Sequence, residues 1–461
     1  MTLWTAEALR AATGGTLPGE VAVDGLSIDT RTLQPGDLFV ALRDQRDGHE
    51  FVAQALAAGA AAVLVDHDPP GVGPDAPLLR VADTLAGLTA LGAAARARSS
   101  ARFVAVTGSV GKTTTKEMLR HGLSAVAPTH AAVASYNNQW GVPLTLARQP
   151  AEARFAVIEI GMNNRGEIAP LSRLARPDVA VITVVAPAHV GHLGSEEIIA
   201  EEKADVFAGL KPGGVAVIPA DGPHAARLAE RAAEAGARLV RFGLDEAAEA
   251  RLLGWDGDAT SSRAEVVLHG RSLRLHLPLP GRHMALNATA ALAAAEALGA
   301  DPAVVAEALG GFTAGAGRGA RQRLPFRGGE ILLLDESYNA STVSIRAALG
   351  VLGAQPAARR VAVLGDMLEL GEHGPGLHLS LAPDAAAAAD LVYACGPLMR
   401  GMFEALPPAR RGAWAPDSAA LAPVLAGALR PGDAVMIKGS LGMRMAVLVA
   451  ALRNGDKEIS R

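Results

Sequence analysis

The stretch of sequence that most constrains the fold of this chain is residues 103–120, FVAVTGSVGKTTTKEMLR. A short apolar run, Phe103–Val106, precedes a glycine-bearing loop, and a helix-favouring segment begins near Lys112. A buried strand, a glycine loop and a helix in this order are the context of phosphate-binding loops. The alternative is an ordinary strand–turn–helix corner with a surface lysine. The position of Gly-Lys-Thr-Thr directly after the strand favours the phosphate loop.

This loop carries the residue types that bind a triphosphate. Glycines let the backbone approach an anion, so that N–H groups of the loop and of the helix start point at phosphate oxygens. Lys112 would place a positive charge beside the terminal phosphates, and the Thr113 hydroxyl would be a ligand for Mg²⁺. The general pattern has a glycine where this chain has Val106. The predicted ATP-binding residues of the loop are Thr107, Gly108, Ser109, Val110, Gly111, Lys112 and Thr113.

The overall composition narrows the class of protein. A chain of 461 residues is too long for one core, and about 150 residues per domain suggests three domains. A net charge of -4 and 3% aromatic residues give neither the basic surface nor the stacking residues of a nucleic-acid-binding protein. The single cysteine, Cys395, fits a reducing compartment. Because the sequence shows neither a signal peptide nor an apolar run of about 20 residues, we expect a cytoplasmic protein without membrane insertion.

The first region, residues 1–82, has the pattern of a small α/β unit in which a helix follows one short apolar strand and precedes another. Two polar clusters, residues 27–31 and 46–49, interrupt this pattern. Such clusters are more often solvated turns, but a loop that combines Ser, Thr and Arg can also hold a diphosphate. The candidate substrate-binding residues of this region are Ser27, Thr30, Arg31, Asp47 and His49.

The middle region, residues 83–314, alternates strands and helices as a parallel sheet does. Three candidate side chains lie where open α/β sheets bind ligands: Glu159 at the end of a strand, His189 after the next strand, and Lys203 on the helix that follows. Each has an ordinary alternative, which is a cap for Glu159, a loop position for His189, and a solvated, charged helix face for Lys203.

The end of the middle region is less regular. Residues 251–277 alternate apolar and polar side chains, which predicts a hairpin at the edge of the sheet. Residues 281–298 form a predicted helix that carries Asn287. The loop 313–323 has three glycines and three arginines, one of which is Arg318, and marks the second domain boundary.

The third region, residues 315–461, contains four apolar strands, each followed by a turn, and the first of them ends in Asp335. This pattern predicts a doubly wound, Rossmann-like sheet. The predicted fold class is therefore α/β with three domains: a small N-terminal α/β unit, a central P-loop parallel sheet and a C-terminal Rossmann-like unit.

These motifs together resemble those of the Mur ligases, ATP-dependent enzymes that form amide bonds in peptidoglycan synthesis. The resemblance runs from about Ser27 to the last helix, and the family's phosphate loop, TGSxGKTTTKEM, has the same shortened glycine pattern as residues 107–118. Residues 334–340, 364–371 and 438–440 indicate the branch that adds D-alanyl-D-alanine. The other matching segments are Asn137-Asn138, residues 141–146, residues 159–162, Ala188-His189, Lys203, His283 and Asn287.

The resemblance implies small-molecule substrates, namely ATP, a UDP-muramoyl-tripeptide and D-alanyl-D-alanine, and a monomeric enzyme. It also implies ligand contacts in each region. The further ATP-binding residues would be Asn287, Arg318 and Asp335, and the further substrate-binding residues would be Asn137, Asn138, Tyr338, Asn339 and Lys438.

The implied catalytic residues are Lys112, Glu159, His189 and Lys203. An amide ligase of this kind brings two anions together, a carboxylate and ATP, so its site needs cations. Thr113, Glu159, His189 and Lys203 would hold two Mg²⁺ ions. A bare Lys203 ammonium would repel a metal, whereas its carbamate would be an anionic ligand, so the resemblance implies a carbamylated lysine.

Some positions depart from the pattern of the branch. Ser341-Thr342 stands where the branch has Asn-Pro, and Asp335-Glu336 stands for Asp-Asp. Two other functions remain: a Mur-type or folylpolyglutamate-type ligase that adds a single amino acid, and a P-loop switch that hydrolyses ATP slowly. The Asp-Asn-Pro-Arg signature of the diaminopimelate-adding branch is absent from the sequence, and a simple switch would not need a third domain.

Overall fold

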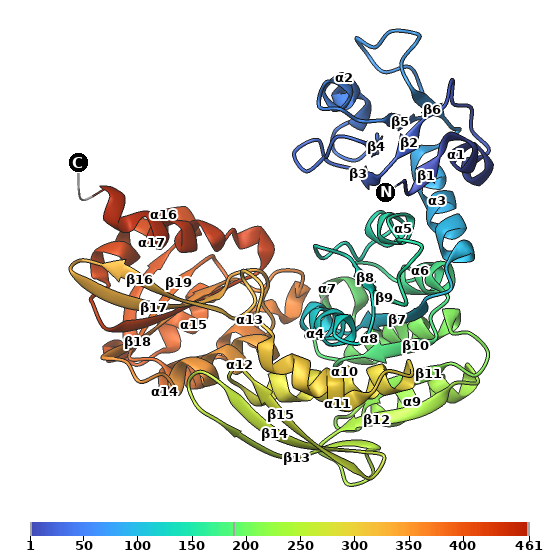
Figure 1. Cartoon of the computed structure of the whole chain (residues 1–461). Helices are drawn as coiled ribbons and strands as arrows, with labels where there is room; N and C mark the ends of the chain where they lie inside the picture. Colours follow the sequence, from blue (N-terminus) through green and yellow to red (C-terminus); the bar gives the residue numbers. More distant parts are fainter. Residues whose placement is uncertain (1, 188–189, 459–461) are drawn as a thin grey trace.

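Three main sheets follow one another along the chain (Figure 1). The computed structural model describes residues 2–187 and 190–458. A four-stranded sheet lies in the N-terminal part, a nine-stranded sheet in the middle and a six-stranded sheet in the C-terminal part. The predicted α/β fold with three units is therefore confirmed. Within the described ranges, no helix is long and apolar enough to cross a membrane.

The N-terminal sheet, in the order β3-β4-β5-β6, is parallel throughout. The carboxyl ends of its strands therefore meet at one edge, and both predicted polar clusters lie on loops that leave this edge. The predicted helix of this unit begins as a 3-10 turn. The elements are β1 (Trp4–Thr5), α1 (Ala6–Thr13), β2 (Ala22–Val23), β3 (Gly25–Ser27), β4 (Asp37–Val40), η1 (Gly48–Phe51), α2 (Val52–Ala57), β5 (Ala62–Val65) and β6 (Leu78–Arg80).

The central sheet has the order β15-β14-β13-β12-β11-β10-β7-β9-β8. Strands β7, β9 and β10 are almost wholly buried, which explains their continuous apolar runs. The elements are α3 (Thr84–Arg98), β7 (Arg102–Thr107), α4 (Lys112–Ser124), β8 (Thr129–Ala131), α5 (Gly141–Ala147), β9 (Phe155–Glu159), α6 (Ile168–Ala175), β10 (Val179–Ile182), α7 (Val190–Leu193), α8 (Glu196–Ala204), η2 (Asp205–Gly209), β11 (Val215–Pro219), α9 (Ala225–Glu234), β12 (Arg238–Gly243), β13 (Ala250–Gly257), β14 (Ser262–Leu268), β15 (Arg271–Leu277), α10 (Arg282–Ala297), α11 (Pro302–Ala308) and η3 (Leu309–Gly311).

The edge of this sheet differs from the predicted hairpin. Strand β13 pairs in parallel with β12, and β14 and β15 then continue the sheet in antiparallel pairing. The edge position is as predicted, but there are three strands rather than two. The second turn, His269-Gly270, is so tight that the alternation of apolar and polar residues hardly changes across it; both residues have positive φ, 47° and 84°.

The C-terminal sheet has the order β16-β17-β21-β18-β19-β20, and only β16 is antiparallel to its neighbour. The predicted loop 313–323 was wrong at its end, because β16 begins at Ala320. As an edge strand, β16 tolerates Pro325. The elements are β16 (Ala320–Phe326), β17 (Gly329–Glu336), α12 (Thr342–Gly353), β18 (Arg359–Gly365), η4 (Gly371–His373), α13 (Gly374–Leu379), α14 (Ala382–Ala388), β19 (Leu391–Cys395), α15 (Met399–Ala405), η5 (Pro408–Arg410), β20 (Arg411–Ala415), α16 (Ser418–Ala428), β21 (Asp433–Lys438), η6 (Leu441–Met443) and α17 (Ala446–Glu458).

The N-terminal and central units share an apolar core through α3 and α5, whose buried side chains join those of α1, β4 and β5 in one cluster. The indole N–H of Trp4 donates to the Ala147 carbonyl at 2.9 Å, and Arg148 Nε donates to the Leu26 carbonyl at 2.7 Å. The central and C-terminal units meet where α7 approaches η4. There the N–H of Gly191 donates to the Glu369 carbonyl at 3.0 Å.

Candidate active site

The phosphate loop between β7 and α4 has the backbone that its glycines predict. Gly108 and Gly111 have φ of 144° and 87°, a region that strains other residues. A Cβ on Gly108 would lie 2.0 Å from Thr183 Oγ1, and one on Gly111 would lie 2.7 Å from Asn287 Oδ1. Both glycines are therefore required by conformation and by space, and Asn287 of α10 lies against the loop.

Residues at the end of β10 hold the loop in place. The Thr183 hydroxyl donates to the Val110 carbonyl at 2.6 Å. The Ser109 N–H donates to the Val184 carbonyl at 2.7 Å, and the Ser109 hydroxyl donates to the Ala186 carbonyl at 2.9 Å. Sequence reasoning missed Thr183, because a hydroxyl that follows a strand has no local signal for this role.

Lys112 opens α4 and folds back over the loop. Its ammonium donates to the carbonyls of Gly108 at 2.6 Å and Ser109 at 3.3 Å. Burial lowers the pKa of Lys112, the charge of Glu159 opposes that change, and the charge of Arg318 lowers the pKa further. The two hydrogen bonds keep the ammonium against the loop, where the phosphate-loop motif places it.

Glu159, at the end of β9, is 2% exposed and faces the start of α4. Its Oε1 accepts hydrogen bonds from the Thr113 hydroxyl at 3.0 Å and from Asn137 Nδ2 at 2.8 Å. Its Oε2 is buried and has no hydrogen-bond partner in the described part of the chain. Glu159 Oε2 and the neighbouring Thr113 hydroxyl are oxygen ligands of the kind that Mg²⁺ prefers, and the hydrogen bonds to Oε1 orient the carboxylate.

The asparagine pair has two different roles in this geometry. Asn137 orients the Glu159 carboxylate, as described above. The Asn138 side chain instead holds the chain at the start of α5, since its Oδ1 accepts the N–H groups of Gly141 at 3.0 Å and Trp140 at 3.2 Å. Contact of either residue with a substrate stays a prediction.

Lys203 is 2% exposed, so the alternative of a solvated helix face is wrong. Across residues 2–187 and 190–458 its ammonium has no hydrogen-bond acceptor and no ion-pair partner. Burial holds the pKa of Lys203 well below its usual value, the charge of Lys112 lowers it further, and Glu202 opposes the shift. A low pKa favours the neutral amine, which is the form that can react with CO₂. The neighbouring Glu201 pairs instead with arginines of α9.

The predicted metal ligands that the structure describes differ in their fit to a metal ion. Thr113 and Glu159 fit a hard cation, whereas the bare amine of Lys203 does not and its carbamate would. His189 lies outside the described residues, so its predicted role as a metal ligand stays a prediction.

Arg318, in the linker to the C-terminal unit, reaches the phosphate loop. Its guanidinium donates to the Ser135 hydroxyl at 2.9 Å and lies 3.8 Å from the centre of the Tyr338 ring. Ser135 Oγ is in turn 3.3 Å from Thr113 Oγ1. One chain of contacts therefore joins the C-terminal unit to the start of α4. Sequence reasoning missed Ser135, because its role depends on these long-range contacts.

The remaining C-terminal candidates lie at or just after the ends of two neighbouring parallel strands, β17 and β21. The Asp335 carboxylate accepts the Ser337 hydroxyl at 2.6 Å. Lys438, only 4% exposed, donates to the Asn339 carbonyl at 3.0 Å and pairs with Glu336 at 3.3 Å. These contacts place the predicted residues together at the carboxyl ends of β17 and β21, while their contacts with ligands stay predictions.

The N-terminal candidates lie at the carboxyl edge of β3–β5. The buried Ser27 hydroxyl donates to the Asp29 carbonyl at 2.9 Å, and the exposed Arg31 pairs with the Asp29 carboxylate at 2.6 Å. Thr30 lies between them in the same loop. His49 is 1% exposed, and its ring nitrogens contact Asp47 Oδ1 and the backbone N–H of Asp66.

Family models and known proteins match nearly the whole chain. The model of the Mur ligase family, catalytic domain, matches residues 22–132, the Mur ligase middle domain matches residues 106–295, and the Mur ligase, glutamate ligase domain, matches residues 322–441. A UDP-N-acetylmuramoyl-tripeptide–D-alanyl-D-alanine ligase of Synechocystis sp. is 35% identical and covers 95% of this chain and 93% of its own length. A ligase of the same name from Escherichia coli is 38% identical over 81% of each chain.

Solved structures agree with these similarities. The crystal structure of MurF from Acinetobacter baumannii has a TM-score of 0.85 and 32% identity, and covers 98% of this chain and 99% of its own. The MurF ligase from Thermotoga maritima in complex with ADP has a TM-score of 0.78 and 27% identity, covering 94% and 97%. From its phosphate loop, its three-unit fold and these matches, the chain belongs to the Mur ligase family.

Proposed function

We propose that this chain is an ATP-dependent ligase that joins D-alanyl-D-alanine to UDP-N-acetylmuramoyl-tripeptide, giving the UDP-muramoyl-pentapeptide of peptidoglycan synthesis. The observation that carries this proposal is the near full-length similarity to ligases of that one name. The use of ATP is further supported by the relative that binds ADP and by the phosphate loop.

In this reaction the γ-phosphoryl group passes from ATP to the tripeptide carboxylate, which gives ADP and an acyl phosphate. The amine of D-alanyl-D-alanine then attacks the acyl carbon, and phosphate leaves as the amide forms. The N–H groups of the loop from Gly108 to Gly111 would bind the phosphates, and the Lys112 ammonium would exchange its loop carbonyls for phosphate oxygens. Arg318 and Asn287 would complete the nucleotide site, with Asp335 behind them.

Thr113 and the free Oε2 of Glu159 would hold Mg²⁺, with Asn137 fixing the carboxylate. When bound, the ion would neutralise charge on the β- and γ-phosphates. His189 and a carbamate of Lys203 would hold a second Mg²⁺ near the substrate carboxylate. The residues of the chain would thus keep two anionic reactants together at neutral pH.

Each unit would then have its own ligand. Residues 1–82 would bind the uridine nucleotide through Ser27, Thr30 and Arg31, with Asp47 and His49 at the same sheet edge. Residues 83–314 would bind ATP, with Asn138 shaping the substrate side of the site. Residues 315–461 would bind the dipeptide. The residues proposed for that last contact are Tyr338, Asn339 and Lys438. We propose a monomeric, cytoplasmic enzyme.

The test is incubation of the full chain with ATP, Mg²⁺, UDP-muramoyl-tripeptide and D-alanyl-D-alanine, with products identified by mass and phosphate release measured in parallel. The expected product is the pentapeptide nucleotide, and phosphate release should require both acceptors. Reactions with single amino acids in place of the dipeptide are the controls. A product with one added amino acid, or phosphate release without any acceptor, would refute the proposal in favour of the two alternatives.

A further inference from the structure

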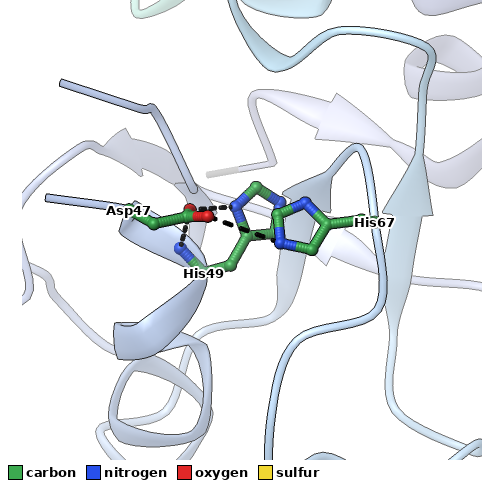
Figure 2. Close-up of side chains that lie close together, drawn as sticks. All are labelled: Asp47, His49 and His67. Atoms are coloured by element: carbon green, nitrogen blue, oxygen red, sulfur yellow. Dashed lines mark hydrogen bonds and ion pairs between the residues drawn. The ribbon is translucent and has the colours of Figure 1, made fainter.

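Three side chains that can ligate a metal meet at the carboxyl edge of the N-terminal sheet (Figure 2). Asp47 and His49 lie after β4, and His67 lies two residues after β5, the parallel neighbour of β4. One possible ligand atom from each side chain lies within 4.8 Å of those from the other two. The topology therefore brings together residues from two loops.

The carboxylate of Asp47 faces both imidazoles, as Figure 2 shows. Asp47 Oδ1 lies 2.6 Å from His49 Nδ1, and Asp47 Oδ2 lies 3.5 Å from His67 Nε2. The two rings are 3.7 Å apart between centroids. His49 is buried, whereas Asp47 and His67 are 37% and 41% exposed, which leaves one side of the cluster open to water.

A second carboxylate lies behind the rings. Asp66 Oδ1 is 2.7 Å from His67 Nδ1 and 3.5 Å from His49 Nε2, and the side chain is only 8% exposed. These are the ring nitrogens that face away from Asp47. Metal-bound histidines commonly donate their other N–H to a carboxylate, which fixes the ring and its tautomer. Asp66 is placed to do this for His67, whereas His49 Nε2 accepts the backbone N–H of Asp66 at 3.2 Å.

Without a metal, the hydrogen bonding at His67 is contradictory. Its Nδ1 lies 2.7 Å from an Arg43 guanidinium nitrogen and 2.7 Å from Asp66 Oδ1. A guanidinium only donates and a carboxylate only accepts, so one ring nitrogen cannot satisfy both. Two carboxylates against one guanidinium also leave a net charge of about -1 when the imidazoles are neutral. Coordination of His67 through Nε2 would make Nδ1 a donor to Asp66, and Arg43 would keep its own hydrogen bond to Asp66 Oδ1 at 2.5 Å.

We propose that Asp47, His49 and His67 bind one divalent transition-metal ion, for which Zn²⁺ is the reference. Two imidazoles and one carboxylate are ligands that such ions prefer, and the exposed side leaves a fourth position for water. The bound ion fastens the loop after β4 to the loop after β5. The site is separate from the proposed Mg²⁺ positions and does not rest on the proposed ligase activity.

The experiment is calorimetric titration of the full, chelator-treated chain with ZnCl₂ in excess Mg²⁺, using wild type, His67→Gln, Arg43→Gln and His269→Gln. His269 is the matched control, since it is 43% exposed, comparable to His67, and lies outside the cluster. Wild type and His269→Gln should bind one Zn²⁺ more than His67→Gln. Arg43→Gln should bind that ion about tenfold more tightly, because the substitution removes the repulsion between the guanidinium and the ion. In water, charges of +1 and +2 at roughly 6 Å repel each other by an energy that corresponds to about a tenfold change in Kd.

Titration with Co²⁺ gives a second readout. A visible absorption band typical of imidazole coordination should form in wild type and be missing in His67→Gln. Circular dichroism of the two variants, whose changes lie at a partly exposed side chain, checks that both are folded. Equal Zn²⁺ stoichiometry and equal Co²⁺ spectra in wild type and His67→Gln would overturn the proposal, as would the same loss in His269→Gln.

Discussion

Two buried lysines of the central unit should respond to the same substitution in opposite ways. Lys116 is 0% exposed, and its ammonium donates to the Ala132 carbonyl at 2.9 Å and pairs with Glu117 at 2.6 Å. Lys203 is 2% exposed and has no such partner in the described ranges. Lys116→Met and Lys203→Met each replace a buried lysine side chain with an apolar one of similar length, so a comparison of the two isolates the role of the partners.

The stability effects follow from these contacts. Lys116→Met leaves the buried Ala132 carbonyl without its donor and leaves Glu117 paired with Arg120 alone, which should cost about 1–3 kcal/mol. Lys203→Met removes an uncompensated buried amine, so it should cost nothing and gain up to about 2 kcal/mol. Because the pKa of Lys203 is lowered on folding, unfolding takes up a proton below pH ~10.5. The stability of wild type should therefore rise with pH towards that value, and that of Lys203→Met should rise less. Urea midpoints in CO₂-free buffer measure both effects.

For activity we expect the opposite ranking: the substitution of Lys203 should lower kcat more than the substitution of Lys116. Lys203→Ala and Lys203→Met would remove the proposed carbamate, and kcat should fall on the order of a hundredfold to a thousandfold. Acetate can occupy the space left in Lys203→Ala and should restore part of the rate, whereas chloride at equal ionic strength should not. The kcat of Lys116→Met should fall by no more than about tenfold, because Lys116 holds a loop and does not contact the reactants. Near-normal kcat of Lys203→Ala without acetate would refute the carbamate, and a loss of stability in Lys203→Met would refute the account of its burial.

Three further changes test other parts of the site. Lys112→Ala should lower kcat about a hundredfold or more while the urea midpoint stays unchanged, and near-normal turnover would remove the phosphate loop from the mechanism. Glu159→Gln should raise the Mg²⁺ concentration needed for half-maximal rate about tenfold or more, and an unchanged Mg²⁺ titration would count against this ligand. Gly191→Val should block the approach of α7 to η4, since a Cβ there would lie 2.3 Å from the Gly371 N atom. Small-angle scattering with an ATP analogue and the tripeptide nucleotide should then show compaction in wild type only; equal compaction in both would show that closure does not use this contact.

The parts of the fold that the sequence predicted are those whose signal is local. Strands β7, β9 and β10 are buried on both faces, so their apolar runs identify them. Strand β16 was missed because its residues, ARQRLPF, alternate at an edge and contain a proline. Ser341-Thr342 stands where the branch has Asn-Pro, and here too the structural effect is local. Ser341 and Ser344 form a capping box that begins α12 without that proline.

The candidate site was predictable as a list of residues, but not as a set of contacts. Gly108 and Lys112 belong to a contiguous motif, so their arrangement follows from the motif itself. The burial of Lys203 could not be read from its acidic neighbours, because Glu202 turns inward to accept the Gly166 N–H and Glu201 pairs with a distant helix. Such pairings depend on how α6, α8 and α9 pack, and sequence spacing carries no record of that packing.

Helix α5 has a consequence for which substrates fit. At its first turn Asn138 is bonded to the helix next to the Glu159 site, and just past its last turn Arg148 holds the Leu26 carbonyl, beside the Ser27 loop. The seven residues of α5 span about 10 Å. Its buried side chains pack in one core with those of α3, which fixes the orientation of the helix. The proposed sites for the uridine end and for the reacting end of the substrate are thus held at a fixed distance from each other. Selection among muramoyl peptides would then depend on whether the peptide is long enough to bridge that separation, without any side chain having to recognise each amino acid.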